Sequence, residues 1–407
     1  MTIVRHTALI ACVLAVLSGG AACSAESPSP NTGATGVEAA PANAPELKVY
    51  EPPRVRDTAS FAVETVCEGL VSPWGLAFLP DGRILITERP GRLRIVENGE
   101  LRSEPVGGAP DVVYEGQGGL LDVELHPEFD ANRLVYLAYT VPDGRGSLMT
   151  RISRHRLEGN ELVDEDIVFP GFPGSRKAKH FGCRIRFLPD GTMLFTLGER
   201  GEGKRSQDLR DLNGKTLRLN DDGSIPDDNP FVDRDDARPE IYTFGNRNCQ
   251  GMAIQPETGR VYQAEHGPSW NDAPGGGDEV NLILPGLNYG WPVIHHEQTR
   301  EGMVPPMLEY TPAIAPAGAC FYTGDAISEW TGDFFFTNLR GKRLIRVELD
   351  DGKPVAEEHL LVDRFGRLRD VETGMDGHLY VLTSQTDAYG PGRRGGDRLL
   401  RIVPKSP

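Results

Sequence analysis

The sequence lacks the motifs of several common enzyme classes. No GxGxxG motif lies between a strand and a helix, and GxSxG is absent, which disfavours a classical nicotinamide enzyme and a serine hydrolase. No CxxCH motif for haem attachment occurs. CxxC and EF-hand spacings are also missing, so the chain offers neither a thiolate metal site nor an EF-hand calcium loop.

Positive charge and apolar residues are both scarce. The 43 Lys and Arg stand against 59 Asp and Glu, and the resulting net charge of −16 would repel a nucleic-acid backbone. The same charge suits divalent cations and neutral substrates. Only 39% of residues are apolar, against 48 Gly and 32 Pro, which favours many short strands joined by turns over a helical bundle.

The first 23 residues predict a signal peptide and therefore export to the periplasm. Arg5 and His6 precede an apolar stretch that is too short for a confident spanning helix. Cys23 follows Gly-Gly-Ala-Ala as at a bacterial lipoprotein processing site, although Gly20 stands where a bulky aliphatic residue is usual. Two outcomes stay open: an outer-membrane lipoprotein anchored at Cys23, or simple cleavage nearby.

Two further segments follow the signal peptide. Residues 24–57 are the predicted disordered tether, because the stretch 24–46 is rich in Pro, Ala, Ser and Gly with almost no large apolar residue. Residues 58–407 form the predicted catalytic domain, and a repeat organises them. In each copy an alternating apolar strand leads into a Pro, Asp or Gly turn and a second β-rich strand, as in a hairpin with one buried face. From the clearest to the loosest, the copies begin at Trp74, Arg184, Arg369, Gly119, Gln250 and Ala317.

The repeat predicts an all-β fold, a six-bladed β-propeller of four-stranded antiparallel blades. The copies recur roughly every 50 to 70 residues, enough for four strands each, and radial closure buries their apolar faces. In this fold the segments that lead into the innermost strands gather at one end of the central channel. Polar residues close to the repeat copies are therefore expected to converge there: Gln117, His180, Arg247, Asn248, Arg340, Arg367 and Arg369.

This set suits a general base beside an anionic ligand. Guanidinium groups bind carboxylates through paired hydrogen bonds, and histidine is the usual general base. A lone His or Arg beside a strand is more often structural, so the hypothesis rests on convergence from five blades. The loop at 264–292 adds Gly-Pro carbonyls and the acidic pair Asp278 and Glu279, which would suit Ca²⁺ or form a solvated acidic loop.

Six ordered motifs then carry a family resemblance over about residues 66–404. They are QGGLLDV, HFGCRIRF, LNDDGSIPDDNPF, FGNRNCQGMA, EHGP with GGDEVN, and LNYGWP. In this order they resemble the soluble quinoprotein glucose and aldose sugar dehydrogenases, the glucose/sorbosone dehydrogenase family. The resemblance implies a six-bladed propeller, an aldose substrate oxidised at C1, pyrroloquinoline quinone (PQQ) as redox cofactor, and Ca²⁺.

The resemblance also implies roles for single residues. His180 matches the general base, Arg247 the arginine beside the reactive quinone carbonyl, and Asn248 its neighbour. The matching cofactor-binding positions are Gln117, Arg247, Arg340, Arg367 and Arg369, where Arg340 replaces a common lysine. The matching calcium ligands are the carbonyls of Gly267 and Pro268 for the cofactor's ion, and Glu279 with the main-chain oxygen of Tyr289 for a structural ion.

Two positions depart from the family pattern near the proposed base. Lys179 stands where relatives carry an acidic or amide residue, so its charge would lower the pKa of His180 or its side chain would point outward. Arg200 stands in another variable pocket position and receives no predicted role.

Four cysteines remain beyond Cys12 in the signal peptide and Cys23. Relatives usually carry glycine at position 183 and proline at position 249, and export permits disulfides. The resemblance therefore predicts a Cys183–Cys249 disulfide, with two buried thiols as the alternative; Cys67 and Cys320 are a remainder.

Two function classes stay open from the sequence. The first is a PQQ-dependent oxidoreductase of aldose sugars that acts on CH–OH groups and passes electrons to an external acceptor. The second is a propeller without redox chemistry, used as a binding module or a calcium-dependent hydrolase, because fold alone does not fix function.

Overall fold

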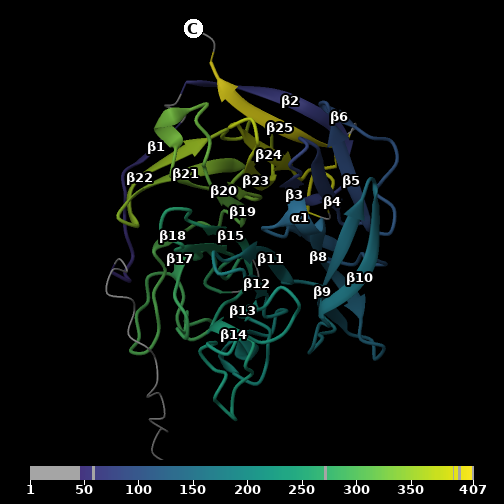
Figure 1. Cartoon of the computed structure of the whole chain (residues 1–407). Helices are drawn as coiled ribbons and strands as arrows, with labels where there is room; N and C mark the ends of the chain where they lie inside the picture. Colours follow the sequence, from purple (N-terminus) through teal and green to yellow (C-terminus); the bar gives the residue numbers. More distant parts are fainter. Residues whose placement is uncertain (1–45, 57–59, 270–272, 388, 393–395, 406–407) are drawn as a thin grey trace, which may run out of the picture. The chain divides into compact units, whose positions relative to one another are not determined.

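The computed structural model describes residues 46–56, 60–269, 273–387, 389–392 and 396–405. The chain divides into the units Met1–Val37 and Glu38–Pro407, and every described residue belongs to the second. In this unit six sheets follow one another along the chain, and their innermost strands contact one another in a closed ring (Figure 1). The predicted all-β, six-bladed propeller is confirmed.

Each blade has four antiparallel strands, and in blades 1 to 5 the first of these four lies innermost; the short β1 (Arg54–Arg56) adds a fifth, parallel strand to blade 5. Blade 1 contains β3 (Pro73–Phe78), β4 (Ile84–Glu88), β5 (Arg92–Glu97) and β6 (Glu100–Leu101). Blade 2 contains β7 (Leu120–Leu125), β8 (Leu134–Pro142), β9 (Leu148–Glu158) and β10 (Glu161–Phe169). Blade 3 contains β11 (Gly182–Phe187), β12 (Met193–Leu197), β13 (Lys215–Leu219) and β14 (Ile241–Phe244). Blades 4 and 5 contain β15 (Cys249–Ile254), β16 (Val261–Glu265), β17 (Asp278–Ile283) and β18 (Leu308–Tyr310); and β19 (Pro316–Phe321), β20 (Phe334–Asn338), β21 (Arg343–Asp350) and β22 (Lys353–Leu360).

Blade 6 joins the two ends of the propeller. It contains β23 (Leu368–Thr373), β24 (Leu379–Thr383) and β25 (Asp397–Pro404), and its outermost strand is β2 (Phe61–Leu70) from the start of the chain. The antiparallel β2–β25 register runs from Phe61 opposite Pro404 to Leu70 opposite Asp397. This pairing of residues near the two ends of the described chain closes the ring.

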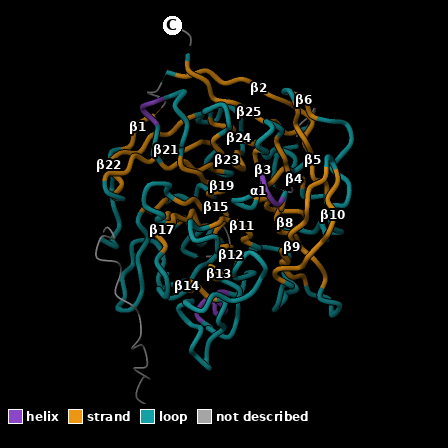
Figure 2. Tube along the Cα trace, in the orientation of Figure 1, coloured by secondary structure: helices purple, strands orange, loops and turns teal. Residues whose placement is uncertain are grey.

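Helix is limited to short turns among the described residues (Figure 2). These are α1 (Phe129–Asn132) and the 3₁₀ turns η1 (Gly203–Gln207) and η2 (Ser328–Trp330). None of them has the length and apolar character needed to cross a membrane. The rest of the backbone is strand and loop, so the sites of interest lie on loops held by strands.

Residues 46–56, expected within the tether, pack against blades 4 and 5. The short strand β1 (Arg54–Arg56) pairs in parallel with β22, and the Tyr50 N–H donates to the Met307 carbonyl at 2.8 Å. Leu47 and Tyr50 add apolar surface to the core between these blades. The segment carries Leu47, Val49, Tyr50 and Val55, unlike the stretch before it. Its main chain also finds partners on an exposed sheet edge, which composition does not reveal.

A buried ionic hub fills the centre of the ring. Arg184 on β11 donates to Asp122 on β7 at 2.7 Å and to Asp370 on β23 at 2.9 Å, and its Nε donates to the Gln250 carbonyl on β15 at 3.0 Å. Its guanidinium also lies over the Trp74 ring of β3, 4.5 Å from the centroid. One side chain therefore connects five blades at the axis of the propeller.

Candidate active site

The candidate site lies where segments next to the innermost strands meet, as the repeat predicts. The Gln117 side-chain oxygen accepts the His180 N–H at 2.7 Å, which joins the segments before β7 and β11. The Asn248 side-chain oxygen accepts the Gly182 N–H at 3.1 Å, which joins β11 to the segment before β15. Arg369 on β23 donates to the Gln250 side chain at 2.7 Å and brings blade 6 to the same place.

His180 is buried and held by Glu199. The residue has a positive φ of 53°, a strained backbone conformation for a side chain other than glycine, and its Nδ1 lies 2.9 Å from Glu199 Oε1. Burial, together with the positive charges of Arg247 and Lys179, lowers the pKa of His180, although Glu199 acts in the opposite direction. The ring is therefore neutral near pH 7, with Nδ1–H directed to the carboxylate and Nε2 left as the basic nitrogen.

Glu199 is a candidate site residue that the sequence did not identify. It follows β12, is nearly fully buried, and its second oxygen accepts the Glu202 N–H at 2.7 Å. Burial would raise the pKa of Glu199, but His180 and Arg247 hold it below the ordinary value, so the carboxylate stays ionised. A signal was present: blades 1, 3 and 4 each carry a glutamate at or just after the end of their second strand, at Glu88, Glu199 and Glu265.

Arg247 and Asn248 are both buried beside this pair. Arg247 Nε lies 3.9 Å from Glu199 Oε1, its Nη1 donates to the His266 carbonyl at 3.0 Å, and its guanidinium lies over the Trp291 ring. The site therefore holds a neutral imidazole and a guanidinium that both lie next to the same carboxylate. This group can accept a proton from a hydroxyl next to a bound anion or an electrophilic carbonyl.

Arg367, Arg369 and Asp387 form a second charged group. Asp387 Oδ2 lies 3.1 Å from Arg367 Nη2 and 3.6 Å from Arg369 Nη2, and it accepts the Ser384 hydroxyl at 2.6 Å. Burial opposes ionisation of Asp387, but Arg369 and Arg367 keep its pKa below the ordinary value. Burial also lowers the pKa of Arg369 to about 10, which leaves it charged at neutral pH. One carboxylate thus faces two cations, and a cofactor carboxylate would find a complementary charge.

Buried polar atoms without a hydrogen-bond partner point to a ligand. Among the described residues they include the Nε atoms of Arg367 and Arg369, Nε2 of His266 and Nε1 of Trp291. Burial and nearby Arg247 hold the pKa of His266 well below its usual value, so its ring is neutral. Unpartnered buried polar groups are rare in folded proteins. This mixture of cationic donors, an indole donor and a neutral imidazole fits a flat, anionic, carbonyl-bearing cofactor such as PQQ.

The predicted calcium ligands occupy a tightly packed loop. Gly267 has no room for a side chain, since a Cβ there would meet the Gly277 carbonyl at 1.8 Å. The Asp278 carboxylate accepts the Gly267 N–H at 2.8 Å and the Ile314 and Ala315 N–H groups at 2.6 and 2.7 Å. Asp278 therefore fixes the peptide that carries the proposed carbonyl ligands, a role the sequence did not assign to it.

The described residues contain no cluster of three or more His, Cys, Asp or Glu side chains placed to hold one metal ion. A calcium site here would depend on main-chain carbonyl oxygens, which are ordinary Ca²⁺ ligands. Burial and the adjacent Glu265 raise the pKa of Glu279 well above its usual value, so a second negative charge at this place is unfavourable without a cation. The roles of Gly267, Pro268, Glu279 and Tyr289 stay predictions.

The structure shows the contacts of Arg200 and Arg340, which the sequence left open. Arg200 is buried, and its guanidinium donates to the carbonyls of Lys179, Leu148 and Lys177 at 3.0, 2.9 and 2.7 Å. It therefore braces the segment that delivers His180. Arg340 is exposed, and its main-chain N–H donates to the Ile314 carbonyl at 3.0 Å, next to the Asp278 contacts. Its cofactor role stays a prediction.

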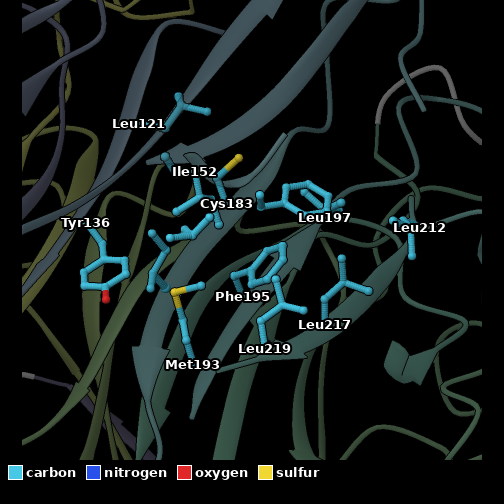
Figure 3. Packing of buried hydrophobic residues seen from close by; sticks show 14 of the residues in the cluster. Leu121, Tyr136, Ile152, Cys183, Met193, Phe195, Leu197, Leu212, Leu217 and Leu219 are labelled. Carbon is cyan, nitrogen blue, oxygen red and sulfur yellow. The ribbon is translucent and has the colours of Figure 1, made fainter. Parts of the chain in front are cut away.

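The predicted Cys183–Cys249 disulfide is wrong, because Cys67, Cys183, Cys249 and Cys320 are all buried free thiols. A positive φ of 84° turns the Cys183 thiol toward the Phe181 carbonyl, 3.2 Å away, in a core that contains Leu121, Ile152 and Phe195 (Figure 3). The Cys249 thiol instead donates to Glu265 at 3.0 Å within blade 4. The positions of the two cysteines in the sequence motifs did not reveal that their thiols contact different partners.

Comparisons with known proteins identify the family of the chain. A model of the family described as Glucose / Sorbosone dehydrogenase matches residues 70–390. The chain is 37% identical over 364 residues to an aldose sugar dehydrogenase of Escherichia coli, which covers 86% of this chain and 94% of that protein. It is 27% identical over 427 residues to quinoprotein glucose dehydrogenase B of Acinetobacter calcoaceticus, covering 80% and 85%. The PQQ-bound structure of an aldose sugar dehydrogenase from Streptomyces coelicolor matches with a TM-score of 0.73 and 32% identity, covering 87% of this chain and 99% of that one.

Proposed function

This chain belongs to the glucose/sorbosone dehydrogenase family and is a quinoprotein sugar dehydrogenase, and from that premise we propose that it oxidises aldose sugars at C1 to the lactone. His180 acts as the general base, Ca²⁺ assists the cofactor, and the electrons leave to an external acceptor.

The observation that carries the proposal is the contact between His180 and Glu199. With Nδ1 bound to the carboxylate at 2.9 Å, the neutral ring presents Nε2 as a proton acceptor. Glu199 then stabilises the imidazolium that forms when His180 takes the C1 hydroxyl proton. Because the ring is neutral at physiological pH, it is ready to accept that proton without first losing one.

The remaining site residues hold the cofactor and the substrate in place. Arg367 and Arg369 would pair with the carboxylates of PQQ, and Arg247 and Asn248 would contact the quinone next to His180. Bound PQQ would supply the electrophilic carbonyl that takes the hydride and its electron pair from C1. Gly267 and Pro268 would offer their carbonyl oxygens to Ca²⁺, whose charge polarises that carbonyl. The proton goes to His180, so C1 loses two electrons and becomes a lactone carbon.

The location of the protein is part of the proposal. Residues 1–45 lie outside the described residues, and both the signal peptide and Cys23 fall within them. We infer export to the periplasm from the sequence of this segment, with the lipoprotein form and the cleaved soluble form as the two alternatives.

A reconstitution assay tests the proposed function. The protein is loaded with PQQ and Ca²⁺ and supplied with an artificial dye and a panel of mono- and oligosaccharides. Aldoses should reduce the dye, and His180→Ala should lose at least about 100-fold in rate while it still binds PQQ. His378→Ala, at a surface turn of blade 6, is the matched histidine control and should keep its rate. If no aldose reduces the dye through fully loaded protein, a non-redox binding role becomes the better explanation.

A further inference from the structure

Glu265 organises the peptide that carries Arg247 and Asn248. The glutamate ends β16 and is nearly fully buried. Its Oε1 accepts the main-chain N–H of Arg247 and, at 3.3 Å, that of Asn248. Its Oε2 accepts the Asn246 side-chain amide at 3.1 Å and the Cys249 thiol at 3.0 Å. Four successive residues thus donate to one carboxylate.

The two segments are linked in the other direction as well. Arg247 Nη1 donates to the His266 carbonyl at 3.0 Å, and the His266 N–H donates to the Asn248 carbonyl at 3.2 Å. Glu265 and His266 therefore face Arg247 and Asn248 through both main chain and side chains. A shift of the carboxylate would move the guanidinium relative to Glu199, whose own N–H donates to the Arg247 carbonyl at 2.8 Å.

Blade 1 contains a related contact that serves the backbone. Glu88 ends β4, as Glu265 ends β16, and it accepts the Val71 N–H at 2.7 Å just before β3. In both blades a buried carboxylate at the end of the second strand holds the peptide that enters the first strand. In blade 4 the held peptide also carries Arg247 and Asn248 of the candidate active site, so the same contact would affect the position of site residues.

We propose that Glu265 is the positioning residue for Arg247 and Asn248, and that the Cys249 thiol is one of the donors that hold this carboxylate. The proposal deepens the proposed function and rests on it for its catalytic meaning. Cys249 fits this role because a buried thiol offers a weak S–H donor, and its sulfur lies 3.0 Å from Glu265 Oε2.

Glu265→Gln is the direct test, because both carboxylate oxygens are acceptors. Whichever way the amide turns, its NH₂ group faces two donors, so at least two contacts are lost. PQQ affinity is measured by absorbance titration without sugar. Glu265→Gln should weaken binding about tenfold, the usual effect of losing hydrogen bonds to a charged group. In the Arg247→Ala chain, Glu265→Gln should lower PQQ affinity by less than about threefold, because the effects of two substitutions are not additive when one residue acts through the other.

A second readout does not depend on cofactor or turnover. Amide hydrogen exchange across residues 245–250 should become faster in Glu265→Gln, because the Arg247 and Asn248 N–H groups lose their acceptor. Glu357→Gln is the matched control: Glu357 is also buried, accepts the Tyr310 hydroxyl, and lies on β22 at the outside of blade 5. It should leave both the exchange of residues 245–250 and PQQ affinity unchanged.

The thiol is tested by a milder pair of variants that keep Glu265. Cys249→Ser retains a donor and should bind PQQ within about threefold of the parent chain, whereas Cys249→Ala should weaken binding further and speed exchange at 245–250. Cys67→Ala removes another buried thiol, on β2, and serves as the control. The S–H stretching band of Cys249 is assigned by its disappearance in Cys249→Ser. The frequency of this band should shift in Glu265→Gln, because the thiol loses its carboxylate acceptor.

Three results would overturn the proposal: unchanged exchange at 245–250 in Glu265→Gln, an equal loss of PQQ affinity with and without the Arg247 side chain, or identical behaviour of Cys249→Ser and Cys249→Ala. If Glu265→Gln does not fold, the Cys249 pair decides. If the parent chain binds no PQQ, the proposed function fails, and the exchange measurement still decides whether Glu265 positions this peptide.

Discussion

His180 is the proposed base, and its pKa is set by opposed neighbours. Burial, Arg247 and Lys179 lower its pKa, while the hydrogen bond from its ring to Glu199 raises it. The balance leaves the pKa below that of an ordinary histidine, so the neutral form, which the proposed role as a base requires, persists below pH 6.5. Glu199 also fixes which ring nitrogen carries the proton, and this orientation is independent of the pKa.

Replacing Glu199 with glutamine separates these two contributions. In the parent chain, kcat/KM should be flat near neutrality and fall on the acid side only below pH 6.5. Glu199→Gln removes an influence that raises the pKa of His180, so the acid limb should move to lower pH, while the plateau falls by about tenfold or more because the ring loses its acceptor. A pH–rate profile measures both effects. An acid limb that moved to higher pH would contradict this assignment.

The four described thiols give a second prediction at the scale of single residues. Burial raises the pKa of Cys67 to about 11 and that of Cys183 to about 12, so folded protein should react slowly with alkylating agents. After denaturation without reductant, all four should be alkylated at once, as read by intact mass. A mass that fits four modifications only after reduction would show a disulfide and contradict the structure.

Several site residues could be predicted from the sequence, and others could not. His180, Arg247 and Arg369 lie at or just before the start of a repeat copy, so the topology of the propeller alone brings them together. Glu199 and Asp387 were not identified, because each contacts another residue across a turn or between strands and no spacing encodes such a contact. Asp278 was named only as part of an acidic pair, and its contact with the Gly267 peptide was missed for the same reason. The disulfide prediction failed for a related reason: the direction of a thiol depends on local φ, and Cys183 has an unusual positive value.

At the scale of elements, ring closure depends on β2. The hairpins inside each blade were predictable from alternation and turn residues, whereas the β2–β25 pairing joins residues at opposite ends of the chain and has no local signal. Leu70 and Cys67 of β2 are buried against blade 6 and blade 1 residues such as Leu399 and Leu76. This strand therefore supplies both hydrogen bonds and core surface.

Two truncations test the closure. A chain that begins at Ser60 keeps β2 and should fold into a monodisperse propeller. A chain that begins at Val71 lacks β2, exposes the edge of β25 and removes part of the core, so it should aggregate or melt at a lower temperature. Size-exclusion chromatography and thermal unfolding measure this difference. Equal Tm values for the two chains would contradict the role of β2.

At the scale of the whole molecule, Arg184 holds five blades at the axis. Removal of this guanidinium would leave Asp122 and Asp370 as buried carboxylates that each lack one partner. Arg184→Met should therefore lower the free energy of unfolding by about 3–5 kcal/mol, measured by urea unfolding. Arg234→Met breaks an exposed ion pair with Asp236 and should cost about 1 kcal/mol or less. Similar losses in both variants would show that the hub does not couple the blades.

The central claim is that buried His180, held by Glu199 beside Arg247, takes the C1 hydroxyl proton of an aldose while the C1 hydrogen leaves as hydride. Anaerobic single-turnover mixing of PQQ-loaded protein with an ordinary or C1-deuterated aldose tests it most directly, because the quinone spectrum then reports the chemical step alone. The account predicts a lactone without deuterium at C1, slower quinone reduction by the deuterated sugar, and a loss of at least about 100-fold in His180→Ala with PQQ still bound. A quinone that no aldose reduces, or that His180→Ala reduces as fast as the parent chain, would contradict it.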